Sequence, residues 1–496
     1  MHTLSLILWT PAVAALFIAL IPDNHPHWVR GVTLTGITGA LVLAWSLTLG
    51  FDSHSPAVQF AESTPWNPEL GSFYALGVDG FSLPMVLLAT LLSLVAVLAS
   101  FSLKERVKGY HVCLLILESG MIGVFTAQDW VLFYVFWEMT LIPLFFLIDQ
   151  WGGKRRQAAS LNFVLYTMGG SVFMLIALLI IYTSSAEHST TMAAMDKAAN
   201  ALPRDSQILV FFGLLIGFGV KIPIFPLHGW LPLAHVEAPS PVSILLSGAL
   251  LKMGAYGMIR ASGMLPVAMA ELQPLLAGLA LVSIVYGGLL AWRQSDLKAM
   301  VAYSSVSHMG VVLLGISTMN QTGLLGATLQ MTAHGLVAAA LFLLIGLLYE
   351  RTHTREIGDY SSLVRVTPRF AVFTTLALLA AMGLPGTVGF VAELHTLIGG
   401  FERWGWWVAG LSVGILVSGA YAMRTIGRLF TGSLSPQMRD VADLHGMELV
   451  AVGLLSFGIV ALGLAPSPAL KLIDASVANL SAAKLAHDST GKSFGH

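Results

Sequence analysis

Long apolar runs separated by short polar stretches make up most of this chain. Each run is close to 20 residues long, about the length at which a helix crosses the hydrocarbon core of a bilayer. Backbone groups in lipid need hydrogen-bond partners within their own segment, so each run is expected to be a helix. We count fourteen runs, at residues 3–21, 30–50, 79–103, 110–127, 129–149, 159–183, 207–226, 241–261, 272–292, 297–317, 322–349, 370–396, 405–428 and 447–468.

The composition agrees with a lipid-embedded chain. Of the 496 residues, 56% are hydrophobic and only 10% are charged, whereas soluble domains carry about 25% charged residues. No alternation of apolar and polar residues suggests a barrel, and a tight turn at Ala127-Gln128-Asp129 has to separate the fourth run from the fifth. The predicted fold class is therefore all-α integral membrane, with about 14 transmembrane helices.

The polar connections differ in charge. Counted from the N-terminus, the odd-numbered connections hold most of the Lys and Arg residues, including those near Lys104, Lys154 and Arg355, whereas the connection 51–78 holds none. Because cytoplasmic loops are rich in Lys and Arg, the odd connections are expected in the cytoplasm and both termini outside. We expect a multi-pass protein of the inner (plasma) membrane of a bacterium, with periplasmic termini.

The sequence contains no motif that we can assign to the binding of a cofactor, a metal or a nucleic acid. Its one cysteine, Cys113, excludes an internal disulfide framework and a self-contained iron–sulfur cluster. We find no nucleotide-binding loop, and the histidines within the runs lack the spacing of a zinc site. The formal net charge of −1 argues against a nucleic-acid partner.

Ionisable residues nevertheless lie inside the apolar runs, where a charge costs at least about 2.5 kcal/mol. Glu138 lies mid-run after Phe136 and Trp137, and Lys221 lies in a later run. A pair between Glu138 and Lys221 would offset both costs and make the protonation of each depend on the other. A small movement would then switch the lysine between holding and releasing a proton. The alternative is a static ion pair that only fixes packing.

Other polar side chains in the runs extend this set. Lys252 is too deep in its run to reach the interface, and Tyr256, one turn later, is positioned to hydrogen-bond to it. His308 lies among serines and His334 lies in another run; both suit either a proton relay or a structural hydrogen bond. Glu118 is a weaker candidate, because its small neighbours also suit packing.

Prolines interrupt two of these runs beside ionisable residues. Pro223 and Pro226 follow Lys221, and Pro385 stands eight residues before Glu393. A proline lacks an N–H, so the carbonyl four residues earlier loses its helical partner and the helix should break. Broken helices at corresponding places in two halves indicate an internal repeat with an ion path at the breaks.

Several motifs together resemble one known family, the antiporter-like subunits of respiratory complex I. The resemblance extends from about residue 75 to residue 430. It is carried by Phe136-Trp137-Glu138 with Leu141-Ile142-Pro143, by Lys221-Ile222-Pro223 with Leu227-His228-Gly229-Trp230-Leu231-Pro232, by Ala234-His235-Val236-Glu237-Ala238-Pro239, by Leu250-Leu251-Lys252 with Gly254-Ala255-Tyr256-Gly257, and by Tyr303-Ser304-Ser305-Val306-Ser307-His308-Met309-Gly310.

One residue narrows the resemblance. Most members of this family carry a lysine in the twelfth helix, whereas the M, or chain 4, type of NADH-quinone oxidoreductase carries a glutamate, and this chain has Glu393 there. The resemblance implies two inverted five-helix repeats (helices 4–8 and 9–13) with helices 7 and 12 broken. The implied divisions are 1–109 for helices 1–3, 110–261 and 262–430 for the two repeats, and 431–496 for helix 14 and a tail.

The resemblance also implies a role for each buried residue. Glu138 and Lys221 are expected to form the coupling pair, with Lys252 as the next relay, His308 and His334 on the connecting axis, and Glu393 at the outlet. The chain itself is expected to carry protons and no cofactor. FMN, iron–sulfur clusters and quinone are expected on partner subunits of the membrane-bound complex, among them neighbouring antiporter-like subunits.

Other functions stay open on the sequence alone. An Mrp-type sodium/proton antiporter subunit shares these motifs, although Glu393 weighs against it. An M-like subunit of a ferredoxin- or hydrogenase-linked complex fits the sequence equally well. An inert membrane scaffold is disfavoured by the buried charges.

Overall fold

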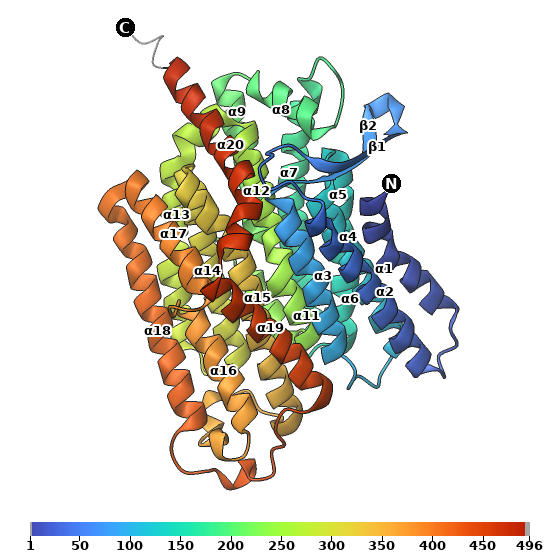
Figure 1. Ribbon diagram of the computed structural model, residues 1–496, viewed down its shortest axis with the longest axis vertical. Coiled ribbons are helices and arrows are strands. Elements are labelled where there is room, and N and C mark those ends of the chain that lie inside the picture. The colour runs from blue at the N-terminus through green and yellow to red at the C-terminus, as the bar shows by residue number, and fades with distance from the viewer. Residues whose placement is uncertain (1, 492–496) are drawn as a thin grey trace.

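Helices make up nearly the whole of the computed structural model, which describes residues 2–491, and most of them run between two ends of the molecule (Figure 1). The predicted all-α membrane fold is confirmed. The helices are α1 (Thr3–Leu20), α2 (Pro26–Ser46), α3 (Ser82–Ala99), α4 (Val107–Thr126), α5 (Trp130–Met139), α6 (Leu141–Trp151), α7 (Arg156–Thr183), α8 (Met192–Asn200), α9 (Arg204–Lys221), α10 (Trp230–Glu237), α11 (Ser240–Leu245), α12 (Leu251–Met264), α13 (Pro266–Arg293), α14 (Leu297–Thr318), α15 (Gln321–Thr352), α16 (Pro368–Ala381), α17 (Val388–Trp404), α18 (Ala409–Phe430), α19 (Gly446–Leu464) and α20 (Ser467–Gly491).

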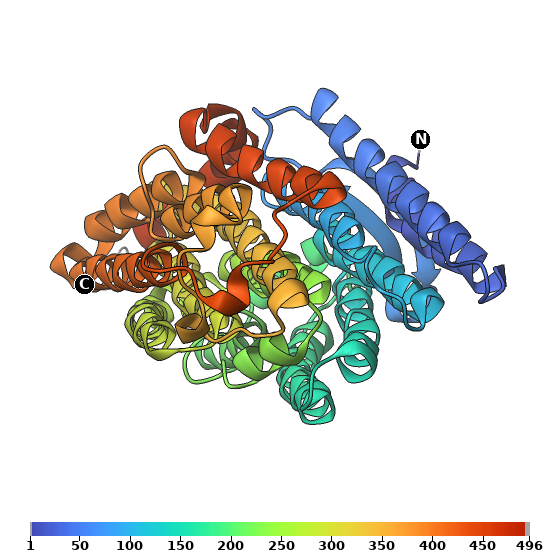
Figure 2. The ribbon, with the colours of Figure 1, turned by 90° about the horizontal axis from the view of Figure 1, so that it is seen from below.

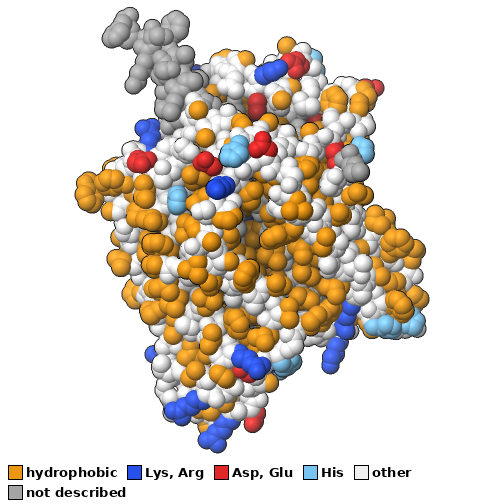
Figure 3. Space-filling view, in the orientation of Figure 1, with side chains coloured by type: hydrophobic (Ala, Val, Ile, Leu, Met, Phe, Trp, Pro, Cys, Tyr) orange, Lys and Arg blue, Asp and Glu red, His pale blue; other side chains and the backbone are white. Residues whose placement is uncertain are grey.

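The helices present an apolar belt to the surroundings. In the space-filling view, hydrophobic side chains cover the middle of the molecule and charged side chains gather towards its two ends (Figure 3). Among the described residues, twelve helical stretches are long and apolar enough to cross a membrane. The predicted runs 207–226 and 370–396 instead contain breaks, so the total of fourteen crossings stays a prediction.

One end of the bundle carries a β-hairpin that the sequence analysis treated as an irregular connection. Strands β1 (Gln59–Asn67) and β2 (Ser72–Val78) pair antiparallel at what we call the hairpin end. Glu62 of β1 is buried and accepts a hydrogen bond from the backbone N–H of Leu4 at 2.7 Å. This contact joins the hairpin to the N-terminus of α1, where backbone N–H groups lack helical partners. Helix α8 also lies at this end, and α20 runs from the middle of the molecule towards it; neither helix was predicted (Figure 1).

The opposite end, here called the basic end, holds the connections that carry Lys104, Lys154 and Arg355. The predicted turn between the fourth and fifth runs lies at the hairpin end and is confirmed, since α4 ends at Thr126 and α5 begins at Trp130. The side chain of Asp129 caps α5 by accepting from the N–H groups of residues 131 and 132, at 2.9 and 3.0 Å.

The centre of the bundle is formed by α11, α12, α14 and α15, whose side chains are almost all buried. Helix α15 packs against α3, α11, α14, α16, α17 and α19. Seen from below, the first helices of the chain lie at one edge of the bundle and α16–α18 lie at the other (Figure 2). Polar side chains on the central helices therefore face other helices and not lipid.

The first predicted break lies directly after Lys221, the last residue of α9, and α10 begins only at Trp230. Pro223 and Pro226 deprive the carbonyls of Gly219 and Ile222 of their helical partners, as predicted, and one of the two carbonyls finds another partner. The carbonyl of Gly219 accepts from the N–H of Ile224 at 3.1 Å. The indole of Trp230 donates to the carbonyl of Val220 at 2.8 Å, which joins the two sides of the break.

The second predicted break separates α16, which ends at Ala381, from α17, which begins at Val388. Gly383 lies within the break at a φ of +74°, a conformation that residues with a side chain rarely adopt. A Cβ at Gly383 would meet the carboxylate of Glu393, whose side chain would then have to shift. The break thus places Glu393 against irregular backbone, as the position of Pro385 predicts.

Candidate functional site

Lys252 lies at the centre of the bundle, directly after a π-helical turn at Leu246–Leu250. Its side chain is fully buried. The Nζ atom donates to the carbonyl of Ser247 at 2.6 Å and lies 2.7 Å from Nδ1 of His334. In that second contact an ammonium donates to the imidazole, or a neutral amine accepts from it. One proton can therefore be shared between these two side chains.

The predicted hydrogen bond between Tyr256 and Lys252 is wrong. The Tyr256 hydroxyl accepts from Nε and Nη2 of Arg260, at 3.1 and 2.9 Å, and Arg260 pairs with Asp79 at 2.7 Å. Side chains on a helix lean towards its N-terminus. The lysine therefore extends back to Ser247, whereas the arginine one turn after Tyr256 extends back to the hydroxyl.

Two histidines and a glutamate continue from Lys252. The His334 and His308 rings have centroids 5.6 Å apart, and Nδ1 of His308 lies 3.6 Å from Oε1 of Glu393. All three side chains are less than a tenth exposed. A cavity of about 10 Å³ lies between these three side chains and Gln330, close to the space that one water molecule needs.

These four residues form what we call the inner chain: Lys252, His334, His308 and Glu393. They come from α12, α15, α14 and α17, respectively. The structure thus brings together four predicted residues that lie in four different apolar runs of the sequence. Amine, imidazole and carboxyl groups at these spacings suit proton transfer, because each group can both take up and release a proton.

The other two predicted residues lie in a second group, the Glu–Lys cluster, which we define as Trp137, Glu138, Thr140 and Lys221. Lys221 is buried, with Nζ 3.3 Å from the Thr140 hydroxyl and 4.4 Å from the centroid of the Trp137 ring. Glu138 is half-buried, at the end of α5. Within residues 2–491 its carboxylate makes no direct contact with the lysine, although the two charges act on each other. The predicted pair is therefore present as neighbours and not as a closed ion pair.

Glu118, the weaker candidate, is fully buried in α4. Neither of its carboxylate oxygens has a hydrogen-bond partner among the side chains and backbone groups that the structure describes. It lies outside both groups of residues defined above, and its role as a proton carrier stays a prediction.

Two further buried residues are not among those that the sequence predicts. Lys298 lies in the first turn of α14 and is 4% exposed, with Nζ donating to the carbonyl of Ala238 at 2.8 Å. His235 of α10 is fully buried, with its ring stacked on Phe342 at 4.5 Å. The only sequence signal for a role of His235 is the family motif that contains it. The signal for the burial of Lys298 is its position as the second residue of an apolar run.

Comparison with known proteins agrees with this arrangement. Residues 127–418 match the family model described as "NADH:quinone oxidoreductase/Mrp antiporter, TM". The chain is 40% identical over 479 residues to NAD(P)H-quinone oxidoreductase chain 4 2 of Thermosynechococcus vestitus, covering 94% of this chain and 89% of that one. It is 39% identical over 497 residues to NADH-quinone oxidoreductase subunit M of Rhodobacter capsulatus, covering 97% and 96%.

A solved structure agrees with the fold. A chain in respiratory complex I from Thermus thermophilus with bound NADH matches with a TM-score of 0.88 and 31% sequence identity, covering 97% of this chain and all of that one. The match to the family model and the two relatives extend over both the Glu–Lys cluster and the inner chain. The chain therefore belongs to the NADH:quinone oxidoreductase/Mrp antiporter family, among the antiporter-like membrane subunits of the M, or chain 4, type.

Proposed function

We propose that this chain is a proton-translocating membrane subunit of an NADH:quinone oxidoreductase. The observation that carries the proposal is the inner chain of four buried ionisable side chains from four helices. Lys252 is in direct contact with His334, and the two further steps are short enough for one water molecule to bridge. Intramembrane ionisable residues are costly and mark ion pathways. The relatives are named as subunits of NAD(P)H- and NADH-quinone oxidoreductases, and we infer that the path works in a complex of this kind.

In this proposal the chain moves protons and other subunits carry out the redox chemistry. Electrons pass from NADH through FMN and iron–sulfur clusters to quinone on partner subunits, and this chain has a single cysteine with which to hold a cluster. Lys221 changes its proton occupancy when its distance from Glu138 changes, because a carboxylate stabilises the charged amine. The inner chain then passes protons between Lys252 and Glu393.

The basic end is proposed to face the cytoplasm and the hairpin end, with both termini, the periplasm. The excess of Lys and Arg in the connections at the basic end supports this orientation. Single cysteines at Lys154, in one of these connections, and at Ser63, on the hairpin, test it. A membrane-impermeant maleimide should label the two from opposite sides of the membrane, and labelling from the same side would refute the orientation.

Glu393 tests the proposed path itself. Glu393→Gln keeps the shape and hydrogen bonding of the side chain but cannot ionise, so we expect coupled turnover to fall without loss of assembly. Glu393→Lys should be milder than Glu393→Ala, because a lysine can also carry a proton. Proton pumping and quinone reduction are measured in membranes of each variant. Parental pumping by Glu393→Gln would remove Glu393 from the path.

A sodium/proton antiporter subunit is the second candidate, because the description of the matching family names both kinds of protein. Expression in an antiporter-deficient host separates the two. A redox-coupled subunit should not restore growth at high sodium concentration, whereas an antiporter should. The subunits that copurify with the chain separate an NADH-linked complex from one linked to ferredoxin or hydrogenase.

A further inference from the structure

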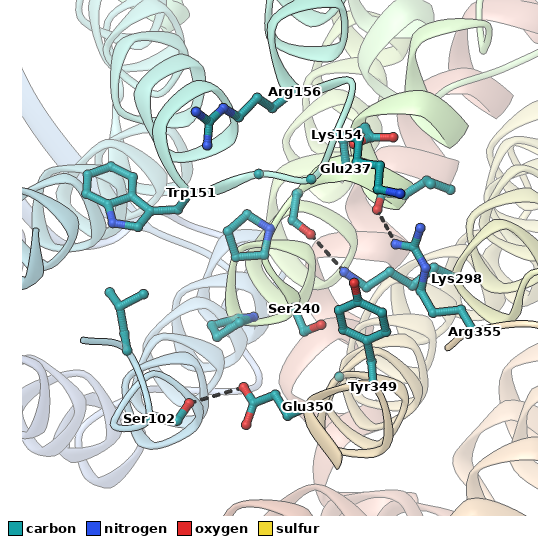
Figure 4. A pocket seen from close by; sticks show the side chains of 18 of the residues that line it. Ser102, Trp151, Lys154, Arg156, Glu237, Ser240, Lys298, Tyr349, Glu350 and Arg355 are labelled. Atoms are coloured by element: carbon teal, nitrogen blue, oxygen red, sulfur yellow. Dashed lines mark hydrogen bonds between the residues drawn. The ribbon is translucent and has the colours of Figure 1, made fainter. Parts of the chain in front are cut away.

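A large cavity opens at the basic end and extends to the buried residue Lys298. Its volume is about 1200 Å³. The lining comes from the connections after α3 and α6, the junction of α10 and α11, the start of α14 and the end of α15 (Figure 4). Polar and charged side chains point into it, among them Ser102, Lys154, Glu237, Lys298, Glu350 and Arg355. A polar space of this size can hold many water molecules.

Lys298 is the buried cation in the wall of this cavity (Figure 4). The charges that act on it are those of Arg355, Asp296 and Glu237. Both carboxylates are already paired with arginines: Asp296 lies 3.1 Å from Nε of Arg355, and Glu237 lies 3.6 Å from Nε of Arg155. In the described part of the chain, Lys298 therefore makes no salt bridge of its own and is held by the Ala238 carbonyl.

His235 is near two buried lysines. It stands in α10, three residues before the Ala238 carbonyl that Lys298 contacts, and the charges of both Lys298 and Lys252 act on its ring. Neither ring nitrogen has a partner among residues 2–491, although the ring is fully buried. Buried polar groups are costly when unpaired. A buried imidazole near both lysines, with neither nitrogen bonded within the described residues, is suited to pass a proton from one lysine to the other.

We propose that this cavity is the mouth of the proton path at the basic end and that Lys298 is its inlet residue. The Lys298 ammonium loses one N–H bond and the His235 imidazole gains one. The neutral amine then takes up a proton that the bulk solution supplies through the cavity, and the imidazolium releases its proton towards Lys252. The proposal rests on the proposed function, because it assigns the uptake side of the same path.

A purely structural role for Lys298 predicts a different result. The Lys298 ammonium donates to the carbonyl of Ala238, the residue that follows α10. A cation at the C-terminus of a helix also stabilises that helix by its charge. Arginine supplies the same charge and hydrogen bond, and glutamine supplies the hydrogen bond within a smaller volume. Neither can release a proton at physiological pH. Lys298→Arg and Lys298→Gln therefore separate a clamp from a proton carrier.

The experiment uses the whole complex in proteoliposomes, with NADH:quinone turnover and dye-detected proton pumping measured together. We expect both Lys298 variants to assemble and to lose pumping per electron by at least about fivefold, in line with loss of a proton-transfer group. Lys108→Met, which removes a cation at the basic end outside the lining of this cavity, should pump like the parent. Pumping close to the parental value in either Lys298 variant, or an equal loss in Lys108→Met, would overturn the proposal.

Lys252→Met, run in parallel, separates failure of this inference from failure of the proposed function. If Lys252→Met pumps like the parent, the proposed function is wrong. If Lys252→Met stops pumping while Lys298→Arg and Lys298→Gln pump normally, only the inlet assignment is wrong. If one of the two Lys298 variants fails to assemble, the other decides, because glutamine and arginine differ in size and charge.

Discussion

The Glu–Lys cluster and the inner chain contain the same kinds of ionisable group in different arrangements. In the inner chain, Lys252 is in direct contact with His334, and the remaining steps are short enough for one water molecule or a small rotation to bridge. In the Glu–Lys cluster, Lys221 contacts a neutral hydroxyl and an indole face. Its predicted carboxylate partner lies beyond direct contact.

This difference indicates two modes of action. A chain of groups already in reach can pass protons without rearranging the bundle. A lysine held off its carboxylate has to move, or the carboxylate has to move, before the two can form a direct contact. Glu138 is half-buried at the end of the short helix α5, so it can respond to whatever covers that face. The Glu–Lys cluster is thus arranged as a switch, and the inner chain as a conductor.

The largest expected effect on pumping comes from interrupting proton transfer in the inner chain. Lys252→Met keeps most of the side-chain volume but removes the proton and the contact with His334. We expect pumping by the complex to fall by at least about tenfold, as for loss of a proton-transfer group. Parallel NADH:quinone turnover and a native gel establish that the complex is intact. Unchanged pumping would show that no proton passes through this residue.

The next largest effect on pumping comes from removing either charged residue of the Glu–Lys cluster. Glu138→Ala and Lys221→Ala should each abolish most pumping while the complex assembles, because each leaves its partner without a counter-charge. Glu138→Asp should keep partial pumping, since the charge survives with a shorter reach. Pumping is compared with turnover in membrane vesicles. Near-normal pumping in both alanine variants would favour an ion pair that only fixes packing.

An intermediate effect is expected at Thr140, which holds Lys221 by its hydroxyl. Thr140→Val keeps the shape but removes this hydrogen bond, worth about 1 kcal/mol, or about fivefold in an equilibrium. The ammonium should then shift towards Glu138 and release its proton less readily, so that pumping falls by up to about fivefold. Thr140→Ser retains the hydroxyl and is the control. Equal pumping by the valine and serine variants would show that this hydroxyl does not set the switch.

The smallest effect is expected at Trp137, whose ring faces Lys221. Trp137→Phe keeps an aromatic face but weakens the cation–π contact, by about 0.5 kcal/mol or somewhat more. Pumping should therefore fall by about twofold or less. Trp137→Leu, which has no aromatic face, should be clearly worse. If the phenylalanine and leucine variants pump alike, the ring acts only through its volume.

The sequence by itself predicts the features that depend on local physics. Runs of apolar residues identify the helices, because lipid admits little else. Prolines after Lys221 and before Glu393 predict both breaks, since each removes an N–H wherever it stands. Ionisable residues inside apolar runs mark the candidate site, because their cost does not depend on knowing the partner.

Only the tertiary structure decides which of these residues meet. Helices α14 and α15 are buried on nearly all sides, and their polar residues are not confined to one face, so their sequences do not show which face turns to which neighbour. The contact of Lys252 with His334 and the ion pair of Arg260 with Asp79 follow from packing between separate elements, as do the burial of Lys298 and the separation of Lys221 from Glu138. Contacts between distant residues depend on the relative rotation and depth of whole helices, which no local pattern in a uniformly apolar segment encodes.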